Sequence, residues 1–180
     1  PELVKNLIDD CFARVAADIA AFGGQVDKVI GDAIVALFGA PVAHEDDAER
    51  AVRAALKMQE TAQSFALSSG AQVRMRVGVN TGEVLVGRFR ADLEYTAMGD
   101  TVNIASRLQT MADPGTVLVG PATYRATRHA MRYESRGPLD LRGMSEAVEV
   151  WRAVEAIGLP GGRRPRRSSP LVGRDDEMEI

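Results

Sequence analysis

The chain has few of the residues that build disulfides, metal clusters or membrane spans. Its 180 residues include one cysteine and two histidines, and the net charge is −3. A single cysteine excludes an internal disulfide, and so few Cys and His side chains exclude a zinc site of the usual kind. No apolar run is long enough to cross a bilayer, and the charge argues against a general nucleic-acid binder. We therefore expect a cytoplasmic soluble domain, with Cys11 as a buried, unreactive thiol in an apolar helical pattern.

Apolar residues make up 46% of the chain, which is enough for a real core, and their spacing predicts alternating helices and strands. Helices are predicted over residues 2–22, 45–69, 100–112 and 122–127. Strands are predicted over residues 25–30, 33–38, 73–79, 83–89, 94–98, 116–119, 133–142 and 147–153. The segment 83–89 is expected to return against 73–79 after a turn at 80–82. This order indicates an α/β fold, an α+β sandwich with a mostly antiparallel sheet flanked by helices.

The segment from Tyr95 to Arg107 carries the most specific chemistry. It reads Tyr-Thr-Ala-Met-Gly-Asp-Thr-Val-Asn-Ile-Ala-Ser-Arg and places Asn103 and Arg107 four residues apart. In a helix these two side chains leave the same face, one turn from each other. An amide donor and a planar guanidinium on one face suit a phosphoryl group that gains charge during transfer.

A second motif, Asp-Lys-Val-Ile-Gly-Asp, covers residues 27–32 between two apolar β-type runs. Taken alone, Gly31-Asp32 is a common two-residue hairpin turn, and Lys28 is an ordinary solvated lysine. A carboxylate at a rigid turn also suits Mg²⁺, which prefers oxygen ligands together with substrate phosphates. The residues alone leave both interpretations open.

Together, the two motifs resemble the catalytic domain of class III nucleotidyl cyclases, most of all the bacterial adenylate cyclases. The resemblance covers roughly residues 1–153 and implies the ferredoxin-like, palm-type cyclase fold. It implies conversion of ATP to cyclic AMP and pyrophosphate, with Asn103 orienting the ribose and Arg107 stabilising the reacting α-phosphate. Lys28 and Thr96 fall on the family's purine-contacting positions. Lysine can only donate, so it can meet the N1 acceptor of adenine, which favours ATP over GTP.

The resemblance also implies metals, a phosphate contact and a partner. Asp32 falls on a metal-binding carboxylate, so two Mg²⁺ or Mn²⁺ ions are expected in a complete site. Arg142 falls on a position that binds the terminal phosphates, where the family often has lysine. Because family active sites form between head-to-tail domains, the resemblance implies a homodimer with two shared sites. His44 and His129 are given no role.

Composition divides the chain into a cyclase domain over residues 1–155, a Gly/Pro/Arg-rich linker over 156–170, and a last segment over 171–180. The last segment resembles the start of a signalling ATPase domain of the AAA or a related type. The family's first strand carries its first metal-binding Asp, and the printed sequence begins in the helix that follows. We therefore expect residues 1–180 alone to be inactive or nearly so.

Two alternatives to an adenylate cyclase stay open. One is a guanylate cyclase, against which Lys28 argues, because guanine carries a hydrogen at N1. The other is a non-catalytic module for nucleotide sensing or dimerisation in a multidomain regulator. The set Lys28, Asp32, Asn103 and Arg107 argues for catalysis.

Overall fold

The computed structural model describes residues 2–70, 73–87, 96–140 and 146–158 of the chain. The chain starts with helix α1, Glu2–Ala21, which ends where Gly23 adopts a left-handed backbone with φ of 77°. Strands β1, Gln25–Ile30, and β2, Ala33–Leu37, then form an antiparallel hairpin. Ile30 pairs with Ala33, so the two-residue turn at Gly31 and Asp32 that the sequence predicts is confirmed.

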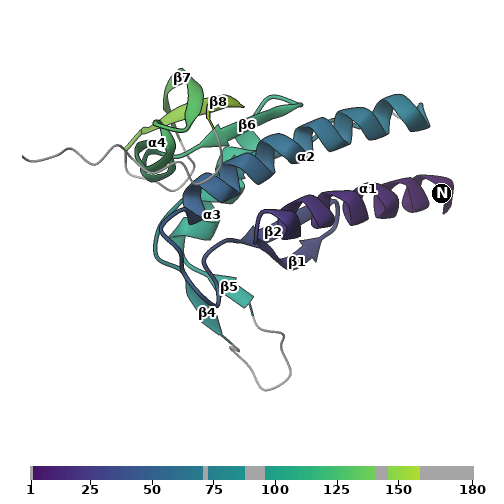
Figure 1. The fold of residues 1–180 in the computed structure, drawn as a ribbon, viewed down its shortest axis with the longest axis horizontal. Helices are drawn as coiled ribbons and strands as arrows, with labels where there is room; N and C mark the ends of the chain where they lie inside the picture. The colour runs from purple at the N-terminus through teal and green to yellow at the C-terminus, as the bar shows by residue number, and fades with distance from the viewer. Residues whose placement is uncertain (1, 71–72, 88–95, 141–145, 159–180) are drawn as a thin grey trace, which may run out of the picture.

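Helix α2, Asp47–Ser69, lies beside α1 (Figure 1). Asp47 and Glu49 lie in its first turn, where carboxylates complement the helix dipole, and Gly70 closes it in the left-handed conformation. Phe65 of α2 joins the buried face of α1 in a core that also covers the β1–β2 hairpin. Cys11 lies in this core, as expected, and burial raises the pKa of its thiol.

The main sheet has four strands in the order β3-β6-β8-β7. Their bounds are Arg76–Val79 for β3, Thr116–Val119 for β6, Met131–Leu139 for β7 and Val148–Ala156 for β8. Strands β3 and β6 run parallel, and the other two pairs in this sheet are antiparallel. Helix α3, Asp100–Met111, lies between β3 and β6 in the chain and provides the crossover that a parallel pair requires.

One predicted pairing is wrong. The sequence suggested that residues 83–89 return against 73–79, but β4, Leu85–Gly87, pairs with β5, Thr96–Met98, in a separate antiparallel ribbon. Strand β3 pairs in parallel with β6, and the chain after β3 leaves the main sheet to form the β4–β5 ribbon. The predicted class is nevertheless confirmed. Every strand pair in the described residues except β3–β6 is antiparallel, and helices flank the sheets.

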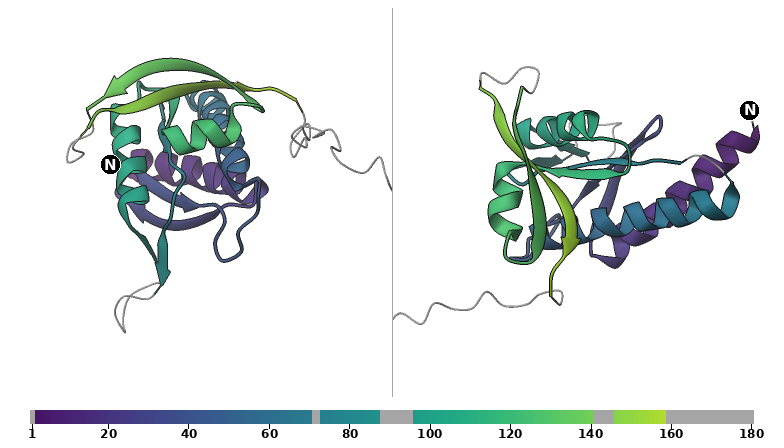
Figure 2. Two further views of the ribbon diagram at one scale, coloured as in Figure 1. Left: turned by 90° about the vertical axis from the view of Figure 1, so that its left-hand side faces the viewer. Right: turned by 90° about the horizontal axis from the view of Figure 1, so that it is seen from above.

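Helices pack on both faces of the main sheet (Figure 2). Side chains alternate along β6, so Val117 and Val119 share a core with α2, while Leu118 packs against Leu108 of α3. Helix α4, Pro121–Thr127, packs on the α2 side. Within the described part of the chain, no helix has the length and apolar character needed to span a membrane.

Candidate functional site

Helix α3 carries the predicted pair Asn103 and Arg107 one turn apart, as the sequence indicated. Asn103 is exposed and Arg107 is half-buried. Their neighbours Ile104 and Leu108 face the main sheet and fix the rotation of the helix. Within the described residues, the side chains of Asn103 and Arg107 have no hydrogen-bond or ion-pair partner, so both remain available to a ligand.

Three contacts hold α3 in place. Gly78 of β3 lies against the α3 backbone so closely that a Cβ there would overlap the carbonyl oxygen of Ala105. In the first turn of α3, the Thr101 hydroxyl donates to the carbonyl of Glu83 at 2.7 Å. The Asn80 amide donates in turn to the Thr101 carbonyl at 3.2 Å. The loop after β3 therefore fixes the start of the helix that presents Asn103 and Arg107.

Lys28 lies on β1, and Thr96 opens β5, where its backbone pairs with Gly87. The two strands are in contact, and a carboxylate that the sequence analysis did not single out links them. The Oδ2 atom of Asp27 lies 3.5 Å from Lys28 Nζ and accepts a long hydrogen bond, also 3.5 Å, from the backbone N–H of Ala97. The structure thus brings the strands of Lys28 and Thr96 together around Asp27.

Asp32 lies exposed in the turn of the β1–β2 hairpin, whose backbone Gly31 shapes with φ of 61°. It borders a cavity of about 410 Å³ between β2, β3 and the inner face of α3. The position and chemistry of Asp32 fit one carboxylate ligand of a divalent cation. The described residues contain no cluster of three or more His, Cys, Asp or Glu side chains that could hold a metal ion.

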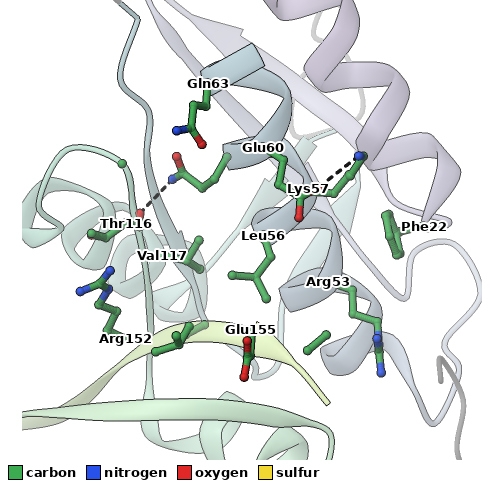
Figure 3. Close-up of a pocket in the computed structure, with 15 residues that line it drawn as sticks. Phe22, Arg53, Leu56, Lys57, Glu60, Gln63, Thr116, Val117, Arg152 and Glu155 are labelled. Atoms are coloured by element: carbon green, nitrogen blue, oxygen red, sulfur yellow. Dashed lines mark hydrogen bonds and ion pairs between the residues drawn. The ribbon is translucent and has the colours of Figure 1, made fainter. Parts of the chain in front are cut away.

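A second cavity, of about 490 Å³, lies between α2, β6 and β8 (Figure 3). None of the predicted site residues lines it. Its charged side chains are compensated, since Lys57 pairs with Glu60 at 3.1 Å and Arg53 with Glu49 at 2.8 Å. Gln59 spans it by donating to backbone carbonyls. This cavity is separate from the candidate site.

The structure brings the strands of Lys28 and Thr96 into contact and places the other predicted residues that it describes on separate elements. Lys28 and Asp32 share the β1–β2 hairpin, and Asn103 and Arg107 share α3, which follows the strand that Thr96 opens. Arg142 lies outside the described residues, as do residues 159–180, which include most of the predicted linker and the whole predicted ATPase segment. Asp27 is the residue that sequence reasoning missed. Its signal was an acidic side chain inside an otherwise β-type run, where aspartate is disfavoured.

Residues 1–153 match the family model described as the adenylate and guanylate cyclase catalytic domain. Adenylate cyclase 1 of Rhizobium meliloti is 34% identical over 165 residues, which are 87% of this chain and 25% of that protein. The guanylate cyclase soluble subunit beta-2 of Rattus norvegicus is also 34% identical, over 97% of this chain and 26% of its own length. The chain thus spans about a quarter of the length of these relatives.

Solved structures of cyclase domains share the fold of this chain. The adenylyl cyclase CyaB from P. aeruginosa is 28% identical with a TM-score of 0.81, over 86% of this chain and 84% of that one. The guanylate cyclase domain of RhGC from Catenaria anguillulae, in complex with GTP, is 25% identical with a TM-score of 0.77, over 83% and 82%. Similarity thus extends to cyclases of both nucleotide types.

Proposed function

Because the chain belongs to the family of adenylate and guanylate cyclase catalytic domains, we propose that it takes part in converting ATP to cyclic AMP and pyrophosphate. The observation that carries the choice of ATP is Lys28, on a strand in contact with the strand that Thr96 opens. An ammonium group only donates hydrogen bonds, and adenine N1 only accepts them. The Thr96 hydroxyl is able to accept from the 6-amino group of adenine.

Asn103 and Arg107 would act on the reacting centre. The ribose 3′-oxygen attacks the α-phosphorus, a new O3′–P bond forms, and the bond to the pyrophosphate oxygen breaks. No covalent enzyme intermediate is needed, so positioning and charge stabilisation dominate. The Asn103 amide would orient the ribose, and the Arg107 guanidinium would stabilise the charge that gathers on the α-phosphate.

Asp32 and Arg142 would serve the triphosphate. Class III cyclase domains generally use Mg²⁺ or Mn²⁺, and Asp32 fits one carboxylate ligand of such an ion. A bound cation would supply activation of the ribose hydroxyl and neutralisation of the polyphosphate charge. Arg142 would bind the terminal phosphates, where a guanidinium offers paired donors in place of the single ammonium of lysine.

We propose further that the chain acts as a head-to-tail homodimer with two shared sites. Homologous cyclase domains bind nucleotides and form dimers. Exposed apolar side chains lie at the end of β1 and on the β4–β5 ribbon, including Val29, Ile30, Leu85 and Met98. Their exposure suits burial against a second copy. Asp32 and Lys28 of one chain would then serve different sites.

A guanylate cyclase is the second candidate, and the soluble guanylate cyclase subunit at 34% identity favours it. Guanine carries a hydrogen at N1 and would place it against the Lys28 ammonium, which has no acceptor. This clash of two donors favours ATP.

The test is a product assay of the full-length protein with Mg²⁺ or Mn²⁺ and either ATP or GTP. We expect cyclic AMP to exceed cyclic GTP, and Arg107→Ala to lower kcat about a hundredfold or more. Arg125→Ala is the matched control, because Arg125 is an exposed arginine on α4. Preferred turnover of GTP would favour the second candidate. Product from neither nucleotide, or equal effects of the two arginine substitutions, would contradict the proposal.

A further inference from the structure

Strand β1 contains a β-bulge at Asp27. Val26 pairs with Ala36 and Lys28 pairs with Val35, so Asp27 is the extra residue on its strand. In a regular strand, neighbouring side chains point to opposite faces. A bulge interrupts this alternation and redirects a side chain. Asp27 Oδ2 and Lys28 Nζ accordingly lie 3.5 Å apart although the two residues are adjacent in sequence.

The Asp27 side chain is buried, with 2% of its surface exposed, whereas that of Lys28 is 31% exposed. A buried carboxylate is tolerated where cations and N–H donors compensate its charge. Asp27 Oδ2 has both, namely the Lys28 ammonium and the backbone N–H of Ala97 in β5. One oxygen atom therefore contacts both Lys28 of β1 and the residue that follows Thr96 in β5, and the two strands are in contact.

We propose that Asp27 is a positioning residue for nucleotide selection. Its carboxylate holds the Lys28 ammonium, at the end of a flexible four-carbon chain, in one orientation relative to β5. An ammonium fixed in advance loses less freedom when a purine binds, so it discriminates better between an acceptor and a donor at N1. This inference rests on the proposed function, in which Lys28 and Thr96 contact the purine. Asp27 itself touches Lys28 and β5 and acts through them.

The test compares nucleotide preference in the full-length protein before and after Asp27→Asn. Asparagine keeps the size of the side chain and an oxygen acceptor for the Ala97 N–H, but it removes the charge that faces Lys28. The readout is kcat/KM for ATP divided by kcat/KM for GTP, measured on one preparation. The fraction of folded enzyme cancels in this ratio, so a purely structural defect leaves it unchanged. We expect it to fall about two- to tenfold, the effect of one hydrogen bond.

Two further variants separate the inference from the function on which it rests. Lys28→Met should lower the ratio by itself, and adding Asp27→Asn to it should change the ratio no further. Asp113→Asn is the matched control, because it removes an exposed carboxylate that pairs with Arg136 at 2.7 Å. It should leave the ratio unchanged. If turnover is not observed, the ratio of Kd values for ATP and GTP, from isothermal titration calorimetry, replaces it.

The outcomes are distinguishable. If Lys28→Met lowers the ratio and Asp27→Asn does not, the positioning role of Asp27 is wrong and the purine contact stands. If Lys28→Met leaves the ratio unchanged, the purine contact is wrong, and the inference falls with it. If Asp27→Asn lowers activity equally for both nucleotides, or abolishes cooperative unfolding, Asp27 holds the fold together and does not position Lys28.

Discussion

Gly78 of β3 and Ala105 of α3 lie in direct backbone contact, and a Cβ at Gly78 would overlap the Ala105 carbonyl oxygen. The contact lies midway between Asn103 and Arg107 in the sequence of the helix. A side chain at position 78 therefore has to displace the helix that presents both residues. The distance between strand and helix is thus tied to the geometry of the proposed phosphate contacts.

We expect Gly78→Ala to lower both stability and turnover. Overpacking a tight contact of this kind costs about 1–3 kcal/mol of unfolding free energy, measured by urea titration. The kcat for ATP should fall as well, because α3 shifts as a body. Gly87→Ala is the control for stability, because a Cβ at Gly87 meets nothing within 4 Å. Equal unfolding free energies for the two variants would show that the strand and helix separate at no cost.

Local sequence signals predicted the hairpin and α3 well. Gly31-Asp32 between two apolar runs is sufficient for a two-residue turn, and the face of α3 follows from helical spacing. The pairing of β3 with β6 and of β4 with β5 was missed, because neighbours of a strand are chosen by the packing of distant segments. The bulge at Asp27 was missed for a similar reason, since it becomes visible only in the register of two paired strands.

The proposed nucleotide preference should respond to Lys28→Glu. Glutamate would face the N1 acceptor of adenine with another acceptor, and it would add a second negative charge beside the buried Asp27. We expect kcat/KM for ATP to fall by a factor equivalent to about 1–3 kcal/mol, with a smaller loss for GTP, whose N1–H is a donor. Steady-state assays with both nucleotides measure this. A parallel loss for the two nucleotides would contradict the purine contact.

The buried ion pair of Arg53 and Glu49 should matter more for stability than an exposed pair. Arg53 Nε donates to Glu49 Oε1 at 2.8 Å, and the two side chains are 8% and 7% exposed. Arg53→Met removes the nearer partner of the buried Glu49 carboxylate and leaves His129, whose Nε2 lies 3.8 Å from Glu49 Oε2, which should cost up to about 3–5 kcal/mol of unfolding free energy.

The control for that variant is Glu155→Gln, which breaks an exposed pair with Arg132 at 2.8 Å. It should change the unfolding free energy by less than about 1 kcal/mol. Urea titrations of both variants give the comparison. If Arg53→Met were as stable as Glu155→Gln, His129 would be a sufficient partner for Glu49 and the prediction would be wrong.

Tyr133 should make stability depend on pH in alkaline solution. Burial raises the pKa of Tyr133 from 10.0 to about 12, and its hydroxyl lies 2.5 Å from that of Thr127. The phenol therefore ionises more easily in the unfolded chain than in the folded one. Its contribution to the unfolding free energy is complete below pH 10. As the pH rises toward 12, up to about 2 kcal/mol of that free energy is lost. Urea titrations across this pH range should show that the unfolding free energy of Tyr133→Phe falls less steeply with pH than that of the unmodified protein. An identical slope for both proteins would contradict the shift.

Shared active sites predict that two inactive variants restore each other. In a head-to-tail dimer, Asp32 of one chain would meet Asn103 of its partner. Asp32→Ala and Asn103→Ala should each be inactive alone. A mixed dimer of the two keeps one site in which both residues are intact, and random mixing should recover about a quarter of the unmodified activity. Cyclic AMP formation by the full-length proteins, mixed under conditions that allow subunit exchange, measures the recovery.

Mixing Asp32→Ala with Asp32→Asn is the control and should restore nothing, because every site then lacks the carboxylate. Copies with different affinity tags establish that mixed dimers form. If they form and no activity returns, Asp32 and Asn103 do not meet across an interface.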